Sequence, residues 1–333
     1  DLPELMLREE GLGVDMPRYQ ELMQVQKDRA RAATTFKVDQ SKADVWQAVE
    51  DVTEERFIGY DTLDEPAARV VAYRTVHGGE AVQHQIVLDK TPFYAESGGQ
   101  IGDTGTLAID GVSVQVLDSQ KMAGRIVHVV DHVPASFDGV VRARVDASRR
   151  EEIKKHHSAT HVLHAALREE LGGHVAQKGS LVAPDRLRFD FSHHRSMTEA
   201  ELAEVERLVN VEILGNQALA TDHDDLDAAI AKGAMALCGE KYDQKVRVVR
   251  VPGFSVELCG GTHTSRTGDI GLFRIASESG VAAGVRRIEA QTGTGALDLV
   301  KRDSERLAEA AKRLKSEPAR LSEAIAKLQD ERK

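Results

Sequence analysis

Residues 148–172 read SRREEIKKHHSATHVLHAALREELG and carry four histidines within nine positions. The apolar residues of this stretch recur three and four positions apart, as in an amphipathic helix, at Ile153, Ala159, Val162, Leu163, Ala166 and Leu167. A Gly-Gly pair at 172–173 follows, so the sequence predicts a helix that begins near Ala147 and ends there. His157 and His161 are four residues apart and project from one face of that helix, where they could bind one metal ion or simply form a polar face.

A second segment supplies complementary donors. Residues 258–266 read LCGGTHTSR and include one of the two cysteines of the chain. The two glycines permit a tight turn that would bring the Cys259 thiolate and the His263 imidazole to one point. Three imidazoles and one thiolate are donors that zinc prefers, so we predict one Zn²⁺ held by His157, His161, Cys259 and His263. The alternative is nucleophilic Cys-His catalysis by Cys259, which would leave the paired histidines without a role.

The remaining histidines and the second cysteine receive simpler interpretations. His156 and His164 are expected to support the site or to face solvent rather than to bind metal. His193 and His194 are expected in a polar loop, with an RNA contact as the alternative. Cys238 is expected to be a small buried residue. Structural zinc sites usually use CxxC pairs, and this sequence has none, so a site joining a helix to a glycine-rich loop indicates a catalytic cleft.

Composition limits the class of protein. A chain of 333 residues suggests two or three domains, and 41% hydrophobic with 4% aromatic residues predicts an aliphatic core. Two cysteines provide no disulfide framework and fit a reducing compartment, so we expect a cytoplasmic protein. No apolar run approaches the roughly 18 residues of a membrane span, and we expect no membrane partner. The net charge of −10 does not indicate nucleic-acid binding, although local basic patches could provide it.

The segment before the histidine helix has a different periodicity. Between about residues 57 and 145, short stretches rich in Val and Ile alternate with turn residues, at 68–76, 81–89, 105–119 and 124–133. Several short strands at regular spacing predict a small barrel or sandwich. The sequence TPFYAESGGQIGDTG at 91–105 is expected to be a tight loop because of its glycines.

After the histidine helix, helices and strands are mixed. We expect a strand at 187–192, a helix capped by Thr198, and further strands in 246–258, 271–280 and 286–293. Helices and strands without strict alternation indicate an α+β fold.

The two ends of the chain read as helical. Residues 1–35 are expected to form helices, and a long polar helix is expected from about Thr294. Its leucines recur every seven residues at Leu307, Leu314, Leu321 and Leu328. Pro318 interrupts this pattern, as the first residue of a second helical segment. We expect this arm to pack on another part of a larger protein.

HSATH at 157–161 followed by CGGTH at 259–263 resembles the HxxxH and CxxxH zinc motifs of the alanyl-tRNA synthetase editing domain. Free-standing alanyl-tRNA editing hydrolases and the threonyl-tRNA synthetase editing domain share that fold. The resemblance covers roughly residues 55–293 and includes the segments at 93–105, 175–193, 233–249 and 265–293. DLPELMLREEGLGVD at 1–15 is similar to the last helices of the tRNA-recognition region, so the flanks favour the synthetase over a free-standing editor.

The resemblance implies an α+β organisation in four parts: a helical linker at 1–54, a β-barrel domain at 55–146, a zinc-binding editing domain at 147–293, and a coiled-coil-like helical arm at 294–333. It also implies hydrolysis of the ester in Ser-tRNA(Ala) and Gly-tRNA(Ala). Such proofreading is needed because a pocket for alanine discriminates weakly against one methyl or one hydroxyl.

Site residues follow from the same resemblance. The zinc ligands His157, His161, Cys259 and His263 would be catalytic, with zinc either activating water or positioning the substrate. Thr160 and Gln177 match family positions linked to recognition of the mischarged amino acid. The alternatives are that Thr160 only bonds its own helix backbone and that Gln177 faces solvent. No Asp or Glu beside the motifs suggests itself as a general base, so a metal-bound or ribose-activated water is expected.

Nothing in the sequence resembles the class II aminoacylation core, and we find no Walker loop and no dinucleotide fingerprint. ATP and Mg²⁺ would therefore serve only an aminoacylation core absent from this chain, which we expect to be a fragment that also lacks the family's C-terminal domain. The expected partner is tRNA(Ala) mischarged with Ser or Gly. Packing or dimer contacts are expected through the C-terminal arm and the missing domain.

Four basic clusters are candidates for holding RNA: SRREEIKK, RLRFDFSHHR, EKYDQKVRVVR and GVRRIEA. Two other functions remain open. One is a zinc esterase acting on small aminoacyl esters, and the other is a non-catalytic RNA-binding module with structural zinc.

Overall fold

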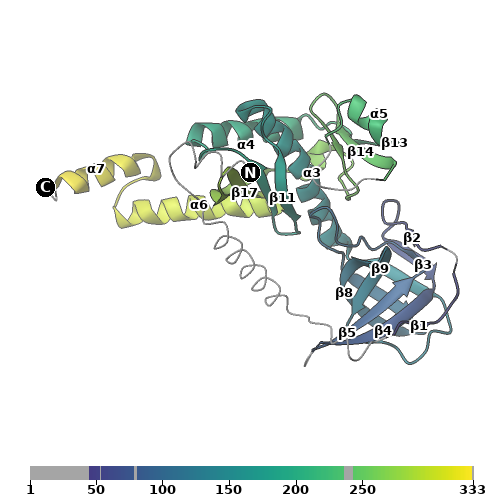
Figure 1. Ribbon diagram of the computed structural model, residues 1–333. Helices are drawn as coiled ribbons and strands as arrows, with labels where there is room; N and C mark the ends of the chain where they lie inside the picture. The colour runs from purple at the N-terminus through teal and green to yellow at the C-terminus, as the bar shows by residue number, and fades with distance from the viewer. Residues whose placement is uncertain (1–44, 53, 79–80, 236–242, 332–333) are drawn as a thin grey trace, which may run out of the picture.

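The structure, a computed structural model, describes residues 45–52, 54–78, 81–235 and 243–331 (Figure 1). The helices predicted at 1–35 and the burial predicted for Cys238 lie outside the described residues.

The described chain combines helices with sheets that are antiparallel apart from one short two-stranded parallel pair, so the α+β prediction is confirmed. The helices are α3 (Ala147–Leu171), α4 (Glu199–Leu214), α5 (Leu226–Ala231), α6 (Gly293–Arg313) and α7 (Leu321–Glu331), with short 3₁₀ turns η1 (Thr267–Ile270) and η2 (Pro318–Arg320). The first ten strands are β1 (Gln47–Ala48), β2 (Arg56–Phe57), β3 (Asp64–Ala68), β4 (Val70–Gly78), β5 (Ala81–Leu88), β6 (Lys90–Thr91), β7 (Gly105–Ile109), β8 (Val112–Met122), β9 (Arg125–Val130) and β10 (Val141–Val145). The later strands are β11 (Gln177–Val182), β12 (Leu187–Ser192), β13 (Ala220–Asp225), β14 (Lys245–Val251), β15 (Ser255–Leu258), β16 (Phe273–Ala282) and β17 (Val285–Thr292).

The N-terminal half of the described chain is an eight-stranded antiparallel sheet with the order β1-β4-β5-β9-β8-β7-β10-β3. The strand stretches expected from the sequence correspond to β4, β5, the β7–β8 hairpin and β9. Alternate Val, Ile and Leu side chains of these strands are buried and form one cluster that also contains Phe93. In β7, β8 and β10 buried and exposed side chains alternate, as period-2 patterning predicts. The opposite face of β4, β5 and β9 carries a second buried cluster, formed by Val71, Val87 and Val127.

The barrel prediction for this region is wrong in one respect, because the sheet curls without closing. Its edge strands are β1 and β3. β1 is two residues long and pairs with β4, and no ladder joins it to β3 within the described residues. Only Arg69 separates β3 from β4, so the chain bends there and pairs with β10 on one side and β5 on the other. β1 also lies inside the segment at 1–54 that was predicted to be helical.

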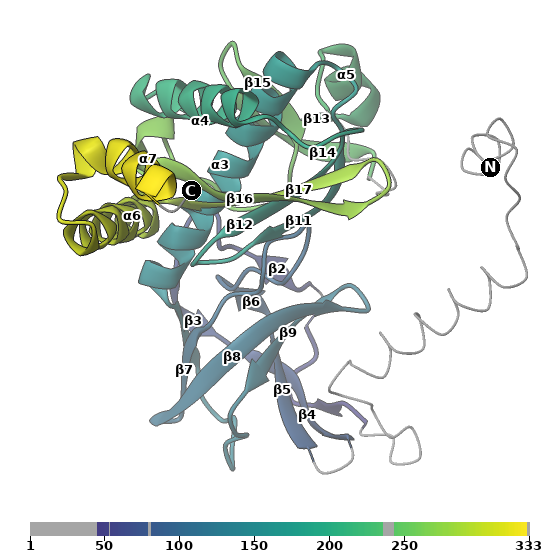
Figure 2. The same ribbon diagram turned by 90° about the vertical axis from the view of Figure 1, so that its left-hand side faces the viewer.

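A second, four-stranded sheet with the order β11-β12-β17-β16 lies next to α3 and α4 (Figure 2). Buried aliphatic side chains of both helices meet Phe189, Phe191 and Phe273 of this sheet in one core. The start of α4 carries the capping box predicted from the sequence, in which Thr198 and Glu201 bond each other's backbone N–H.

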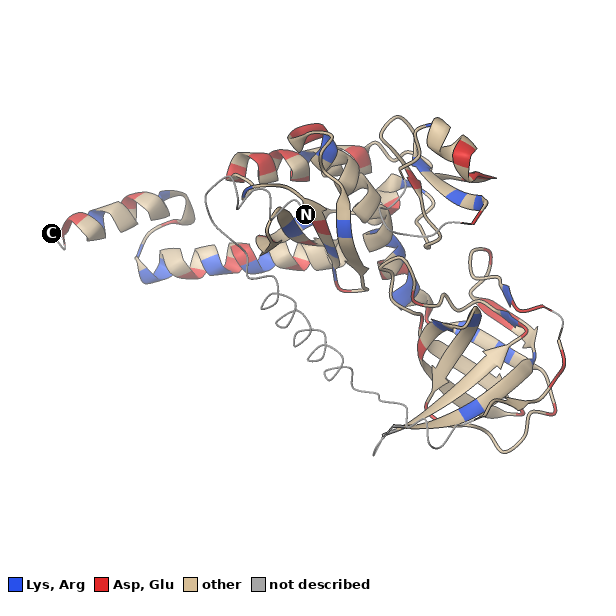
Figure 3. Cartoon of the chain, viewed as in Figure 1, with Lys and Arg blue, Asp and Glu red and all other residues tan. Residues whose placement is uncertain are grey.

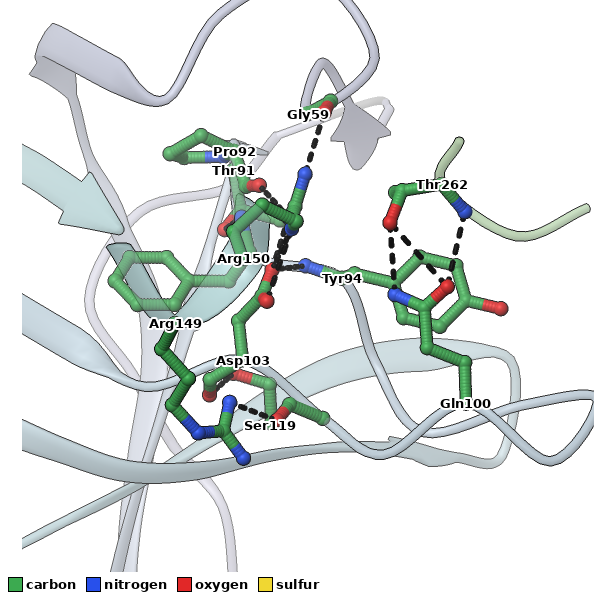
Figure 4. Close-up of polar contacts among 12 residues, drawn as sticks. Gly59, Thr91, Pro92, Tyr94, Gln100, Asp103, Ser119, Arg149, Arg150 and Thr262 are labelled. Carbon is green, nitrogen blue, oxygen red and sulfur yellow. Dashed lines mark hydrogen bonds and ion pairs between the residues drawn. The ribbon is translucent and has the colours of Figure 1, made fainter. Parts of the chain in front are cut away.

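Helix α3 connects this core to the curled sheet (Figure 1). Its first turn is capped by Asp146, and Arg150, one turn further on, is completely enclosed. The Arg150 guanidinium forms an ion pair with Asp103 and donates to Gly59 O at 2.8 Å and Pro92 O at 3.0 Å (Figure 4). Because Asp103 belongs to the glycine-rich loop at 91–105, this buried pair fixes that loop against α3.

A third sheet, β13-β14-β15, precedes the segment that contains Cys259, and α5 packs on it. The sequence did not reveal β13 or α5.

The last described elements are α6 and α7, which form the C-terminal arm. Pro318 begins η2 between these helices, as predicted. Of the four leucines with heptad spacing, Leu307 and Leu328 are exposed at 47% and 45%, whereas Leu314 and Leu321 are half-buried. The division into four domains remains a prediction.

Candidate metal centre

The structure brings His157, His161, Cys259 and His263 together, with their potential ligand atoms all within 4.8 Å of one another. The two histidines of α3 face the turn that follows β15. The Cys259 sulfur lies 3.3 Å from His157 Nε2 and 3.3 Å from His263 Nε2. A helix face and a loop about a hundred residues away thus provide one compact donor set.

The second ring nitrogen of each of these histidines is held by another side chain. His157 Nδ1 lies 2.7 Å from Gln100 Oε1, and His161 Nδ1 lies 2.6 Å from Glu257 Oε2. His263 Nδ1 lies 3.3 Å from Ser158 Oγ. Supporting contacts of this kind fix the orientation of metal-binding histidines and raise their basicity.

The donor set fits a zinc ion. His161 Nε2 is buried and has no hydrogen-bond partner, although the other nitrogen of the ring is bonded. A buried polar atom without a partner is costly, and a bound cation would satisfy it. Three nitrogens and one sulfur match the chemistry of zinc.

The electrostatics of the cluster favour an ionised sulfur. Burial acts to raise the pKa of the Cys259 thiol, but His157, His161 and His263 favour the thiolate and hold this pKa well below its usual range. Burial acts to lower the pKa of His161, but Glu257 and Cys259 outweigh it and raise this pKa to about 10. The thiolate is the form of cysteine that binds metals.

The turn from Cys259 to Gly261 is held by its backbone carbonyls. Arg247 Nη1 donates to Cys259 O and to Gly261 O, each at 2.9 Å. Tyr60 stacks under the Arg247 guanidinium at 4.4 Å, and its hydroxyl donates to Gly260 O at 2.5 Å. All three successive carbonyls are therefore bonded.

Gly261 has no space for a side chain. A Cβ there would lie 2.0 Å from His157 Cε1 and 2.4 Å from His157 Nδ1. Only glycine lets the turn approach the His157 ring this closely, which explains one of the two glycines of the CGGTH sequence.

A cavity of about 100 Å³ opens beside the cluster, and His157, His161 and Cys259 form part of its wall. Thr160 and Gln177 also line it. Thr160 Oγ1 donates to His156 O at 2.8 Å, as its simpler interpretation expected, and Gln177 Nε2 donates to Ser180 Oγ at 3.3 Å. Gln177 is half-buried and borders the cavity instead of facing open solvent.

Two residues at this site escaped sequence reasoning. Glu257 is buried and its two oxygens bind His161 Nδ1 and His164 Nδ1. Burial acts to raise the pKa of Glu257, but the two histidines hold it at about 2. A lone carboxylate in the apolar strand immediately before CGGTH was the available signal.

The second residue that the sequence did not reveal is Gln100, which lies in the glycine-rich loop at 91–105. Its Oε1 accepts from His157 and from Thr262 N at 2.9 Å, and its Nε2 donates to Thr262 Oγ1 at 3.0 Å (Figure 4). Gln100 is completely buried, so one amide joins the curled sheet to both metal-binding segments. Only the glycines of this loop stood out in the sequence.

Of the four other histidines that the sequence singled out, three are buried and one is exposed. His156 bonds Glu152 O at 3.0 Å and Thr292 N at 3.2 Å, which ties α3 to the end of β17. His164 supports the site through Glu257, as one of its two expected roles. His193 is buried, whereas His194 is exposed.

Acidic partners neutralise much of the basic clusters, and Figure 3 shows the two charges interspersed over the chain. The paired arginines are Arg150 with Asp103, Arg188 and Arg287 with Asp190, Arg195 with Glu201, Arg250 with Asp222, and Arg286 with Glu278. Three basic side chains of these clusters, Arg150, Lys154 and Arg247, line a cavity of about 260 Å³ that includes His263. Lys154 also forms a surface ion pair with Glu151 at 2.8 Å.

Comparison with known proteins assigns the class. Residues 1–149 match the family model described as "tRNA synthetases class II (A)". Residues 246–289, which include Cys259 and His263, match "Threonyl and Alanyl tRNA synthetase second additional domain". Both models describe parts of aminoacyl-tRNA synthetases.

Curated relatives narrow the class. An alanine–tRNA ligase of Salinibacter ruber is 52% identical over 100% of this chain and 35% of its own length. Those of Xanthomonas axonopodis pv. citri and Xanthomonas campestris pv. campestris are 50% and 47% identical, over 93% and 100% of the chain and 36% and 38% of their own lengths. The chain belongs to the alanyl-tRNA synthetase family, and it spans little more than a third of the length of the curated relatives it matches.

Two predictions from the sequence, one on the aminoacylation core and one on membrane spans, can be compared with these findings. We predicted that nothing resembles the class II aminoacylation core, yet residues 1–149 do match a class II family model. That an ATP-using core is absent remains a prediction. Among the described helices, none is both long and apolar enough to cross a membrane.

Proposed function

We propose that this chain is the proofreading part of a longer alanine–tRNA ligase, and that it hydrolyses the ester of Ser-tRNA(Ala) and Gly-tRNA(Ala). The observation that carries the proposal is a four-donor cluster, three members of which, His157, His161 and Cys259, form part of the wall of a small cavity lined by Thr160 and Gln177. The similarity to alanine–tRNA ligases supports the synthetase part. Charging with alanine, with ATP and Mg²⁺, would belong to the remainder of that enzyme.

The reaction consumes one water. Its oxygen adds to the ester carbonyl, the bond to the ribose oxygen of the terminal adenosine breaks, and the ribose oxygen takes up a proton. The products are the free amino acid and tRNA(Ala). His157, His161, Cys259 and His263 would hold Zn²⁺, which supplies Lewis-acid polarisation of the ester or of a water.

The residues of the chain would select and orient the substrate. The Gln177 amide and the Thr160 hydroxyl are the polar groups proposed to bond the serine hydroxyl. The small cavity would limit the side chains that can enter. Glu257 is not free to act as a base, because both oxygens are bonded to histidines, so it is proposed to orient His161.

Mischarged tRNA(Ala) would approach from the larger cavity. Lys154 and Arg247 line it and come from two of the basic clusters, so they are proposed to meet phosphates near the acceptor end. Phosphate contacts would make binding weaken with salt. The arm formed by α6 and α7 is proposed to contact the rest of the enzyme or a second subunit.

The test is deacylation of Ser-tRNA(Ala) and Ala-tRNA(Ala) by the wild-type chain and by Cys259→Ala. The proposal expects rapid release of serine by the wild type only and little release of alanine. Equal hydrolysis of both tRNAs would indicate a general esterase. A folded, zinc-loaded wild type without activity, also after addition of the remainder of an alanine–tRNA ligase, would indicate a non-catalytic RNA-binding module.

A further inference from the structure

Three histidines form a second cluster away from the candidate metal centre. His174 lies in the loop between α3 and β11, and His193 and His194 follow directly after β12. Their potential ligand nitrogens all lie within 4.8 Å of one another. The sequence suggested only a polar loop at His193 and His194 and gave no reason to connect them with His174.

The two clusters are separate sites. They share no residue. From His161 to the end of α3 at Leu171 the helix runs ten residues, or about 15 Å at 1.5 Å per residue, and His174 lies beyond that end. One ion cannot serve both groups.

The backbone that carries the second cluster is held in place. Ser192 Oγ donates to His174 O at 2.8 Å and accepts from Ala176 N at 2.9 Å, which joins the two histidine-bearing segments. Arg168 donates to Val175 O at 2.7 Å. A site whose supporting groups are already bonded is preorganised for a ligand.

The histidines also have the geometry of a shared ligand site. His174 Nε2 lies 2.9 Å from His193 Nδ1, and the rings of His193 and His194 have centroids 4.8 Å apart. His193 is only 4% exposed, whereas the other two reach solvent. The cluster is therefore reached from the side of His174 and His194, whose rings are exposed to solvent.

The three imidazoles indicate which class of metal ion this cluster would bind. Imidazole nitrogens suit Zn²⁺, Cu²⁺, Ni²⁺ and Co²⁺, while Mg²⁺ and Ca²⁺ prefer oxygen ligands. Arg195, the neighbouring cation, is bonded at both ends of its guanidinium to Glu201, at 2.8 Å and 2.5 Å. Its charge is therefore matched by a carboxylate and opposes a bound cation less.

We propose that His174, His193 and His194 form a second metal site, specific for borderline divalent transition-metal ions. The three imidazoles leave further coordination positions to water. A bound ion fastens the loop after α3 to the end of β12, next to the core that supports His157 and His161. This inference does not depend on the proposed editing activity.

The experiment titrates the whole metal-free chain with Co²⁺ and follows the absorption spectrum. Binding at the Cys259 site produces thiolate-to-cobalt charge-transfer absorption, whereas a site made only of histidines adds visible d–d absorption without it. We expect a second equivalent of the latter kind. His174→Asn and His194→Asn change exposed side chains and should each weaken the second equivalent by at least about tenfold.

His223→Asn is the matched control, because His223 is an exposed histidine of β13 outside both clusters. The His223→Asn protein should bind the second equivalent of Co²⁺ with wild-type affinity. A single equivalent in the wild type would overturn the proposal. So would a second equivalent that keeps wild-type affinity in both His174→Asn and His194→Asn.

Discussion

Gln100→Leu should weaken zinc binding although Gln100 is not a ligand. Its Oε1 accepts hydrogen bonds from His157 Nδ1 at 2.7 Å and from Thr262 N at 2.9 Å. The leucine keeps a similar bulk but removes both acceptor contacts. The His157 ring then loses the group that fixes its tautomer, and the CGGTH turn loses one of its anchors.

The magnitude follows from these two contacts. Each buried donor left without an acceptor costs about 1–3 kcal/mol of folding stability. Removing the partner of a metal-binding histidine lowers metal affinity by about 10–100-fold. We therefore expect Gln100→Leu to lose both stability and zinc affinity.

The assay measures zinc affinity by competition with a chelator, and stability of the metal-free chain by denaturant unfolding. Gln85→Leu is the matched control. Gln85 is also a buried glutamine, 2% exposed, but its amide accepts from Arg74 at 2.7 Å and donates to Gln83 at 2.6 Å within the curled sheet. This variant should lower stability and leave zinc affinity unchanged.

Wild-type zinc affinity in a folded Gln100→Leu protein would refute the reasoning. Equal loss of zinc affinity in the two variants would also refute it, because the effect would then arise from general destabilisation of the sheet.

Two further predictions concern the fold around the site. Arg150→Met leaves Asp103 buried without its cation and should destabilise the chain by about 3–5 kcal/mol, measured by denaturant unfolding. His128 is buried between Thr91 Oγ1 and Ile86 O, and burial lowers its pKa from 6.5 to about 4. The unfolded chain therefore binds more protons between these values, so stability should fall by about 3 kcal/mol as the pH drops from 6.5 to 4. His128→Asn should remove that part of the pH dependence of unfolding.

Each of these two predictions has a control variant at a surface residue of the same chain. Arg142→Met breaks an ion pair with Asp64 in which both side chains are solvent-exposed, so it should change stability little. A loss as large as that of Arg150→Met would contradict the importance of burial. His223→Asn should leave the pH profile of the wild type, and an unchanged profile in His128→Asn would show that this histidine is not the titrating group.

Local signals predicted the elements that carry the donors. The spacing of the apolar residues and the Gly-Gly pair predicted α3, and Thr198 with Glu201 predicted the start of α4. The two glycines before His263 predicted the tight turn that follows Cys259. These features depend on neighbours within a few residues of one another, so sequence alone reveals them.

Contacts between distant segments could not be predicted in the same way. Gln100 reaches His157 only because the buried pair of Arg150 and Asp103 fixes the glycine-rich loop against α3. The role of Glu257 depends on how β15 lies against α3. Strand spacing likewise indicates strands but not their order, so a sheet that curls without closing was predicted to be a barrel.

The most direct test of the central claim follows editing activity as zinc is added. The metal-free chain is titrated with Zn²⁺, and single-turnover hydrolysis of Ser-tRNA(Ala) is measured at each zinc-to-protein ratio beside occupancy of the Cys259 site. If the four-donor cluster is the hydrolytic centre, the rate should rise in proportion to occupancy of that site and stop rising when it is full. Full activity in the metal-free chain, or a rate that does not change as the site fills, would contradict the account.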